Sequence, residues 1–77
     1  MKVVEVVWDD AHVTLDECSI KDAQKTKPIR THTIAYLMAE NDYGITLATD
    51  IFPSDPKKGH MINFVPWGMV VEYWEYE

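Results

Sequence analysis

Residues 30–52 read RTHTIAYLMAENDYGITLATDIF, and this stretch decides the fold. Apolar and polar residues alternate on both sides of Asn41-Asp42, a pair that tolerates the positive φ of a tight two-residue turn. Alternation with a period of two is typical of half-buried β-strands. The stretch therefore predicts a hairpin of two strands, 30–40 and 43–52, at the centre of a sheet, with Leu47 on its apolar face.

Three further strands follow from the same alternation outside the hairpin. They span residues 2–8, 60–65 and 69–76. Residues 53–59 form a surface loop by composition, and residues 66–68 form a tight turn. Val, Ile and Thr number 20 against 3 Leu, which favours strands because β-branched side chains suit a pleated surface. Five short twisted strands curl, so we expect a small antiparallel barrel of the SH3-like or Sm-like type.

The polar connection between the first two strands contains one helix signal. Ser19 followed by Asp22 has the form of a capping box, which predicts a short helix over residues 20–25. Pro28 prevents its continuation. A helix this short is unstable alone, so we expect it to lean on the sheet and to cover Cys18 as a small hydrophobic residue.

Length and charge limit the class of protein. We expect residues 1–77 to form a single, mainly β domain with one short helix between the first two strands. Seven basic residues face 13 acidic ones, for a net charge of −6, which argues against a duplex-DNA binder because such proteins neutralise phosphates with basic side chains. No apolar run approaches the roughly 18 residues of a membrane span. One cysteine excludes an internal disulfide and a cysteine-built zinc site.

Side chains that catalyse reactions or bind metals are scattered along the sequence. His12, His32 and His60 lie far apart, whereas zinc sites often contain a pair of ligands close in sequence. The acidic residues that follow the first strand lack the spacing of a calcium loop. Cys18 and Ser19 lie in neither a nucleophile elbow nor a Gly-rich oxyanion loop. The sequence therefore predicts no metal, no cofactor and no enzymatic activity.

Aromatic residues are the informative excess, because nine rings exceed what a small barrel can bury. Trp8 and Phe64 fit the core. The other rings either extend the core, form a self-association face or stack a flat-ring ligand. The candidates for self-association are Trp74, Tyr76 and Tyr73. The candidates for a nucleotide-like ligand are Trp67, Trp74 and Tyr36 for stacking, with Arg30, His32, Lys57 and Lys58 for phosphate contacts.

Three pieces of the chain resemble a group of small bacteriophage accessory proteins. They are the V-x-W-x-D-A opening strand at 6–11, the hairpin core at 32–43 continuing into Leu47-Ala48, and VPWGMV at 65–70. The resemblance implies a phage origin, a host-cytoplasm setting and a small SH3-like or Sm-like barrel.

The resemblance also implies a binding activity, because small phage accessory barrels generally act by binding. We expect a homo-oligomer that sequesters a small nucleotide immune signal in pockets at subunit boundaries, which is a counter-defence activity. The alternative is an acidic inhibitor that docks on the basic surface of a host defence or transcription protein. A structural phage accessory protein is the third reading.

Overall fold

The computed structural model describes residues 2–11 and 17–76, apart from the side chain of Pro56. Five antiparallel strands form one sheet in the order β4-β3-β2-β1-β5. In chain order the elements are β1 (Val3–Asp10), α1 (Ile20–Ala23), β2 (Ile29–Glu40), β3 (Gly44–Phe52), β4 (Asp55–Pro66), the 3-10 helix η1 (Trp67–Met69) and β5 (Val70–Tyr76). The predicted mainly β class, the five antiparallel strands and the short helix after the first strand are confirmed.

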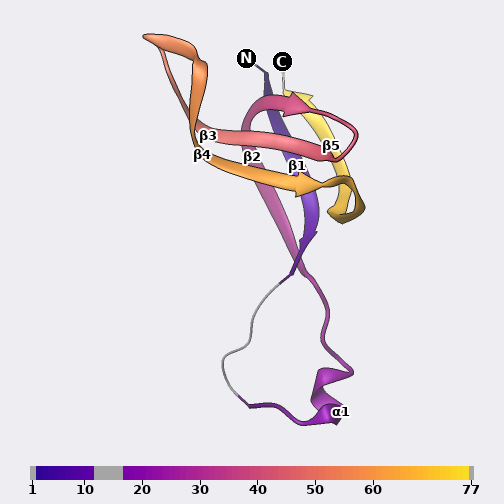
Figure 1. The fold of residues 1–77 in the computed structure, drawn as a ribbon. Helices are drawn as coiled ribbons and strands as arrows, with labels where there is room; N and C mark the ends of the chain where they lie inside the picture. The colour runs from indigo at the N-terminus through magenta and orange to yellow at the C-terminus, as the bar shows by residue number, and fades with distance from the viewer. Residues whose placement is uncertain (1, 12–16, 77) are drawn as a thin grey trace.

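The sheet bends so that β3 and β4 cross β1 and β2, as Figure 1 shows. The side chains inside this bend form the core, and we call this side of the sheet the inner face. The largest fully buried side chains come from three strands: Val4, Val6, Ile45, Leu47 and Val65. All of them are branched aliphatic side chains of moderate size, because the two halves of the bent sheet approach each other closely. The predicted assignment of Leu47 to the core is confirmed.

The central hairpin is confirmed, but its turn is not of the predicted kind. Leu37 pairs with Leu47 across β2 and β3. Asn41 Oδ1 accepts hydrogen bonds from the backbone N–H groups of Tyr43 at 2.8 Å and Gly44 at 3.3 Å. Among the described non-glycine residues only Met61 has a positive φ, so the prediction of a positive-φ two-residue turn is wrong. The Asn41 side chain holds the reversal instead, as in an Asx turn.

Strand β4 is longer than predicted and takes in most of the predicted loop 53–59. It begins at Asp55, which pairs with Phe52, and Gly59 pairs with Ile51. A Cβ on Gly59 would lie 2.7 Å from the Cβ of Ala48, so only glycine allows the strands to approach here. Further along β4, Met61 has a φ of 56°, a left-handed conformation within an edge strand.

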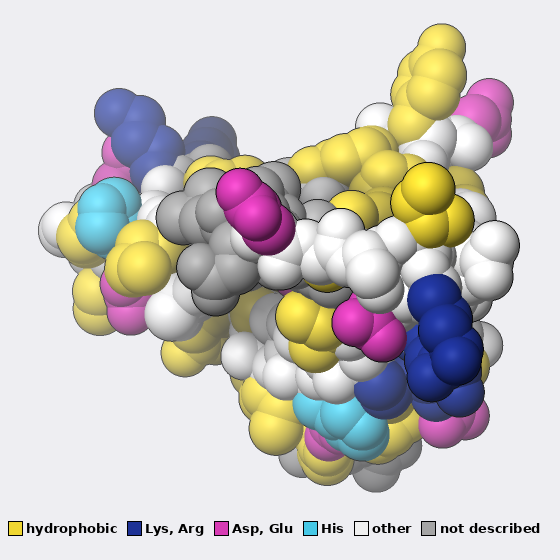
Figure 2. Space-filling view, turned by 90° about the horizontal axis from the view of Figure 1, so that it is seen from below, with side chains coloured by type: hydrophobic (Ala, Val, Ile, Leu, Met, Phe, Trp, Pro, Cys, Tyr) yellow, Lys and Arg dark blue, Asp and Glu magenta, His cyan; other side chains and the backbone are white. Residues whose placement is uncertain are grey.

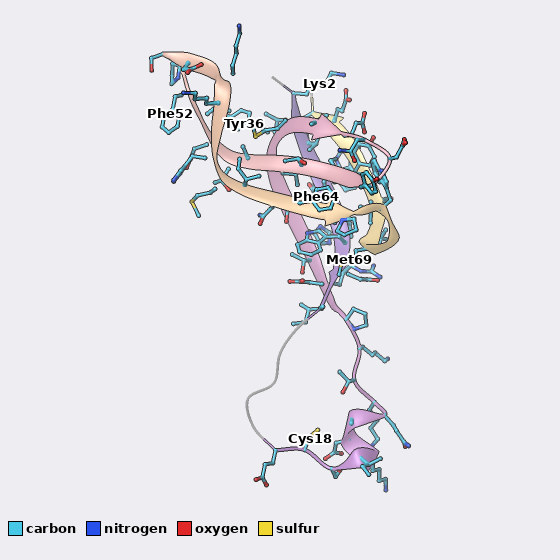
Figure 3. All side chains as sticks on the ribbon, viewed as in Figure 1. Lys2, Cys18, Tyr36, Phe52, Phe64 and Met69 are labelled. Carbon is cyan, nitrogen blue, oxygen red and sulfur yellow. The ribbon has the colours of Figure 1, made fainter. Side chains whose placement is uncertain are left out.

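The connection between β1 and β2 extends away from the sheet, and we call its described part, residues 17–28, the arm (Figure 1). The Ser19 cap is confirmed, because its Oγ accepts from the Asp22 N–H at 3.1 Å. All described arm residues are exposed, including Ile20 at 81%. The predictions that this helix leans on the sheet and covers Cys18 are therefore wrong, and Figure 3 shows Cys18 far from the strands.

The physical reason is that α1 has four residues and one large apolar side chain, so it offers little surface to bury. In the described part of the chain, no helix has the length and apolar character needed to cross a bilayer.

Of the two aromatic residues predicted to fill the core, one does so. Trp8 packs against the core, and its indole N–H donates to Thr33 Oγ1 at 3.0 Å. Phe64 is 48% exposed, so its assignment to the core is wrong. The reason is register: Val65 points into the bend, and its neighbour Phe64 therefore points to the opposite side.

Replacement of Leu47 by Asp tests the core. Leu47→Asp removes a fully buried side chain and buries a charge without a partner. We expect a loss of at least ~3 kcal/mol in the free energy of unfolding, measured by urea denaturation. Thr49→Asp, at an exposed position of the same strand, is the control and should change it by less than about 0.5 kcal/mol. Equal stabilities of the two variants would contradict the core.

Replacement of Gly44 by Ala tests the close approach of β3 and β4. A Cβ on Gly44 would lie 2.9 Å from the Cα of Pro66 and closer still to the carbonyl oxygen of Val65. Both neighbours are backbone atoms, so we expect Gly44→Ala to cost about 1–3 kcal/mol. A Cβ on Gly68 would meet open space, so Gly68→Ala is the control. Thermal unfolding of both variants decides the matter, and a stable Gly44→Ala protein would refute this packing.

Candidate functional site

The side of the sheet opposite the core carries apolar and aromatic residues on β2, β1 and β5, which are mostly exposed on β2 and β5 and half-buried or buried on β1. The strand register arranges them in three rows. We call this set the outer face, and it consists of Val3, Glu5, Val7, His32, Ile34, Tyr36, Glu72, Trp74 and Tyr76. Ile34 is 62% exposed, Tyr76 46% and Trp74 38%. Side chains of this size, exposed together, are typical of a binding surface.

A hydrogen-bonded carboxylate lies at the centre of the outer face. Glu5 pairs with Ile34 on one side and with Trp74 on the other. Its Oε2 lies 3.0 Å from His32 Nδ1, and its Oε1 accepts a hydrogen bond from the Tyr76 hydroxyl at 2.5 Å. The Glu5 side chain is only 13% exposed, whereas that of His32 is 59% exposed. The carboxylate is thus fixed by two partners within an apolar surround.

These contacts change the acidities of both hydroxyl and carboxyl groups. The hydrogen bond from Tyr76, followed by that from His32, lowers the pKa of Glu5 below its ordinary value. The same hydrogen bond to Glu5 raises the pKa of Tyr76. Glu5 is therefore ionised at neutral pH, and no Lys or Arg of the outer face neutralises it. Its free lone pairs suit a cationic or hydrogen-donating partner.

The structure brings together some of the predicted ligand residues and separates others. Tyr36, His32 and Trp74 share the outer face. Arg30 lies at its end, but its guanidinium is held by Asp9 at 2.6 Å, and this hydrogen bond raises the pKa of Arg30. An anionic ligand would have to compete with Asp9 for that guanidinium.

Trp67, Lys57 and Lys58 lie away from the outer face. Trp67 packs on the core side, where its indole N–H donates to the Asn41 carbonyl at 2.6 Å. Lys57 and Lys58 lie near the start of β4, and Lys58 is 3.6 Å from Asp55. Figure 2 likewise shows Lys and Arg side chains at separate places on the surface. The seven predicted ligand residues thus do not form one site within this chain.

The predicted self-association residues divide between the two faces. Trp74 and Tyr76 lie on the outer face at the edge strand β5. Tyr73 lies on the inner face, where its ring is 5.8 Å from that of Trp67 and its hydroxyl donates to Glu40 at 2.8 Å. Tyr73 therefore supports the core, whereas Trp74 and Tyr76 are free to contact another molecule.

A pocket of about 500 Å³ lies between the base of the arm and the turn before β5. Its lining residues are Asp9, Ala11, Thr26, Lys27, Pro28, Gly68 and Met69. None of the seven predicted ligand residues lines it. Its walls come from three distant parts of the chain, and no sequence pattern signals their proximity.

Metal and nucleophile candidates do not converge in the part of the chain that the structure describes. His12 and Asp16, the latter one of the acidic residues that follow the first predicted strand, lie outside the described residues. Within residues 2–11 and 17–76 no group of three His, Cys, Asp or Glu side chains could hold a metal ion. Cys18 is exposed on the arm rather than buried. The absence of enzymatic activity stays a prediction.

Compared with protein-family models, curated proteins and solved structures, the chain matches none of them. The relationship to phage accessory proteins therefore stays a prediction from the sequence resemblance.

Removal of the Tyr76 hydroxyl tests the network around Glu5. Tyr76→Phe deletes the largest cause of the lowered pKa of Glu5, so that pKa should rise toward its ordinary value near 4.5. Carboxyl carbon NMR titration measures it. Tyr73→Phe removes a hydroxyl bonded to Glu40 and should leave the Glu5 pKa unchanged. An equal Glu5 pKa in both variants would exclude the network.

The same network predicts a pH dependence of stability. Because the folded-state pKa of Glu5 lies below its unfolded value, ionised Glu5 stabilises the fold above the unfolded pKa. This contribution disappears as the pH falls through the folded-state pKa. Glu5→Gln should therefore lose less stability than the wild type between pH 7 and pH values below about 4.5, as judged by urea midpoints. Parallel curves would contradict the assignment.

Proposed function

We propose that this chain is a non-enzymatic binding protein that self-associates through its outer face. The single observation behind this proposal is the joint exposure of Ile34, Trp74 and Tyr76 around a fixed carboxylate, on the side of the sheet opposite the core. Trp and Tyr are enriched at the centres of protein interfaces.

The size of the chain supports self-association. A chain of 77 residues buries only roughly 60–65% of the surface that its unfolded form exposes, so its core is marginal. The fully buried side chains in the described residues are few and of moderate size. Burial of the outer face against a partner would add apolar contacts that the core lacks. β5 is also an edge strand, and soluble proteins usually cover or blunt such edges.

The finer fold belongs to the same proposal: a small barrel of the SH3-like or Sm-like type. Two features support it. The first and last strands are neighbours, and the 3-10 helix η1 turns the chain between β4 and β5. The phage origin, the counter-defence role and the host-cytoplasm setting rest on the sequence resemblance alone.

Replacement of Trp74 by Ala tests the interface. We expect the wild type to have at least twice the 8.9 kDa chain mass at micromolar concentration, measured by light scattering or sedimentation. Trp74→Ala should weaken association by about 30-fold or more, since truncation of an interface anchor costs at least ~2 kcal/mol. Tyr43→Ala is the control, because Tyr43 is 80% exposed but lies outside the outer face. A monomeric wild type would refute the proposal.

Sequestration of a nucleotide-like ligand is the second candidate function. The observation that favours it is the presence of Tyr36, His32 and Trp74 on one face, where two copies could stack a base between them. The net charge of −6 and the carboxylate of Glu5 disfavour an anion. The outer face therefore fits a protein partner better than a nucleotide. The same negative charge supports the alternative function, in which the chain docks on a basic host protein.

A nucleotide panel in a thermal-shift assay decides the second candidate. A specific ligand at 100 times its Kd adds ~2.7 kcal/mol to the stability of the folded form. For a domain of this size that corresponds to a shift in Tm of roughly 10 °C or more. Loss of the shift in Trp74→Ala, with retention in Tyr43→Ala, would assign the ligand to the outer face. No shift with any nucleotide would exclude this candidate.

A further inference from the structure

The arm is a projecting segment whose described residues are all exposed. Ile20 is 81% exposed and Ile29, where β2 begins, is 53% exposed. The Cα radius of gyration is 15.6 Å, whereas a compact chain of this length has about 11–12 Å. The longest dimension is 52 Å against 23 and 21 Å for the others, and Figure 1 shows that the arm lies along it.

The four-residue helix α1 within this segment is not stable on its own. It nevertheless has an N-terminal cap, in which the Ser19 hydroxyl accepts a hydrogen bond from the Asp22 N–H. Isolated turns of this kind gain most of their stability by packing an apolar side chain on another surface. Ile20 is the side chain of α1 that is available for such packing.

The charge of the arm is opposite to that of the rest of the chain. The arm has a net charge of +1, because it contains three basic residues and two acidic ones: Lys21, Lys25, Lys27, Glu17 and Asp22. Because the whole chain carries −6, the remainder carries −7. The outer face contributes two carboxylates, those of Glu5 and Glu72, whereas the one basic side chain at its end, that of Arg30, is paired with Asp9 at 2.6 Å. The arm and the outer face are therefore complementary in charge as well as in apolar character.

We propose that the arm of one copy lies across the outer face of a second copy, and that the exchange is reciprocal. This inference rests on the proposed self-association and names the segment that covers the outer face. Ile20 packs among Ile34 and Trp74, while Lys21 and Lys25 lie over the carboxylates of Glu5 and Glu72. Each copy gives one arm and receives one, so the assembly closes as a two-fold dimer and does not grow into a fibre.

Charge reversal on the arm provides the first test. Lys21→Glu combined with Lys25→Glu should weaken dimerisation at least about tenfold in sedimentation experiments. Lys57→Glu combined with Lys58→Glu makes the same change of charge near the start of β4 and is the control. Both doubles should fold, because all four lysines are exposed. Equal dimer Kd values for the two doubles would overturn the proposal.

Charge exchange sharpens this test. Glu72→Lys should by itself weaken the dimer, and it should restore association when combined with Lys21→Glu, since opposite charges then face each other again. Higher salt should weaken the wild-type dimer because exposed charges are screened. If the losses of dimer affinity in the two variants are simply additive, with no restoration in the combined variant, the arm lysines do not lie on the outer face.

The single cysteine allows a direct observation of the contact. Cys18 is exposed on the arm, one residue before the helix cap, and accepts a nitroxide label. Chains that carry the nitroxide but no ¹⁵N are mixed with ¹⁵N chains that carry no nitroxide. Only the ¹⁵N chains give signals, so any line broadening by the nitroxide is intermolecular. We expect the indole N–H signal of Trp74 to broaden. That of Trp67, on the core side of the sheet, should stay sharp and serves as the internal control.

The outcomes separate this inference from the function on which it rests. A monomeric wild type overturns both. A dimer that is weakened by Trp74→Ala, with no broadening of the Trp74 signal, keeps the outer-face interface and overturns the arm as its occupant. A dimer with selective Trp74 broadening and a weakened arm double variant supports both.

Discussion

Strand β1 is paired along both edges, with β2 on one side and β5 on the other, and the rest of the structure depends on this double pairing. It fixes both faces of the strand at once. Val4 and Val6 on one side become the centre of the core, without any exposed surface. Glu5, between them in sequence, points to the opposite side. One octapeptide thus supplies the middle of the core and the middle of the outer face.

The double pairing also explains why the outer face consists of residues from three parts of the chain. Val3 faces Tyr36 on one side and Tyr76 on the other. Without β5, Glu5 would keep His32 but lose the Tyr76 hydroxyl, and its pKa would lose the largest cause of its decrease. The lowered pKa of the Glu5 carboxyl therefore depends on the same strand pairing that completes the sheet.

Much of this fold could be predicted from the sequence, because alternation along a strand is a local property. The hairpin of β2 and β3 and the burial of Leu47 follow from it, and the short helix follows from another local signal, the Ser19 cap. The errors concern tertiary contacts. Whether a helix leans on a sheet depends on the apolar surface it can bury, and α1 has only Ile20 to offer. The assignment of Phe64 to the core was wrong because side chains alternate along a strand. Val65 points into the core, so its neighbour Phe64 points to the opposite side of the sheet.

The candidate site was less predictable than the fold. The period of two places His32 and Tyr36 on one face of a strand, and Trp74 and Tyr76 on one face of another. No local pattern says that β1 lies between these strands, so Glu5 was not a candidate from the sequence. Its signal was a single charged residue within the apolar run 3–8. Such a residue has either solvent or a specific partner beside it, and only the sheet order distinguishes the two.

The left-handed backbone of Met61 has a consequence for the outer edge of β4. A non-glycine residue at a φ of 56° costs roughly 1–3 kcal/mol and interrupts the regular pleat. A foreign strand that approached this edge would meet a local twist instead of an even row of N–H and C=O groups. The edge also carries exposed Lys58 and His60, which discourage such an approach. The irregularity thus disfavours the amyloid-like pairing of further strands along β4, the longer of the two edge strands of the sheet.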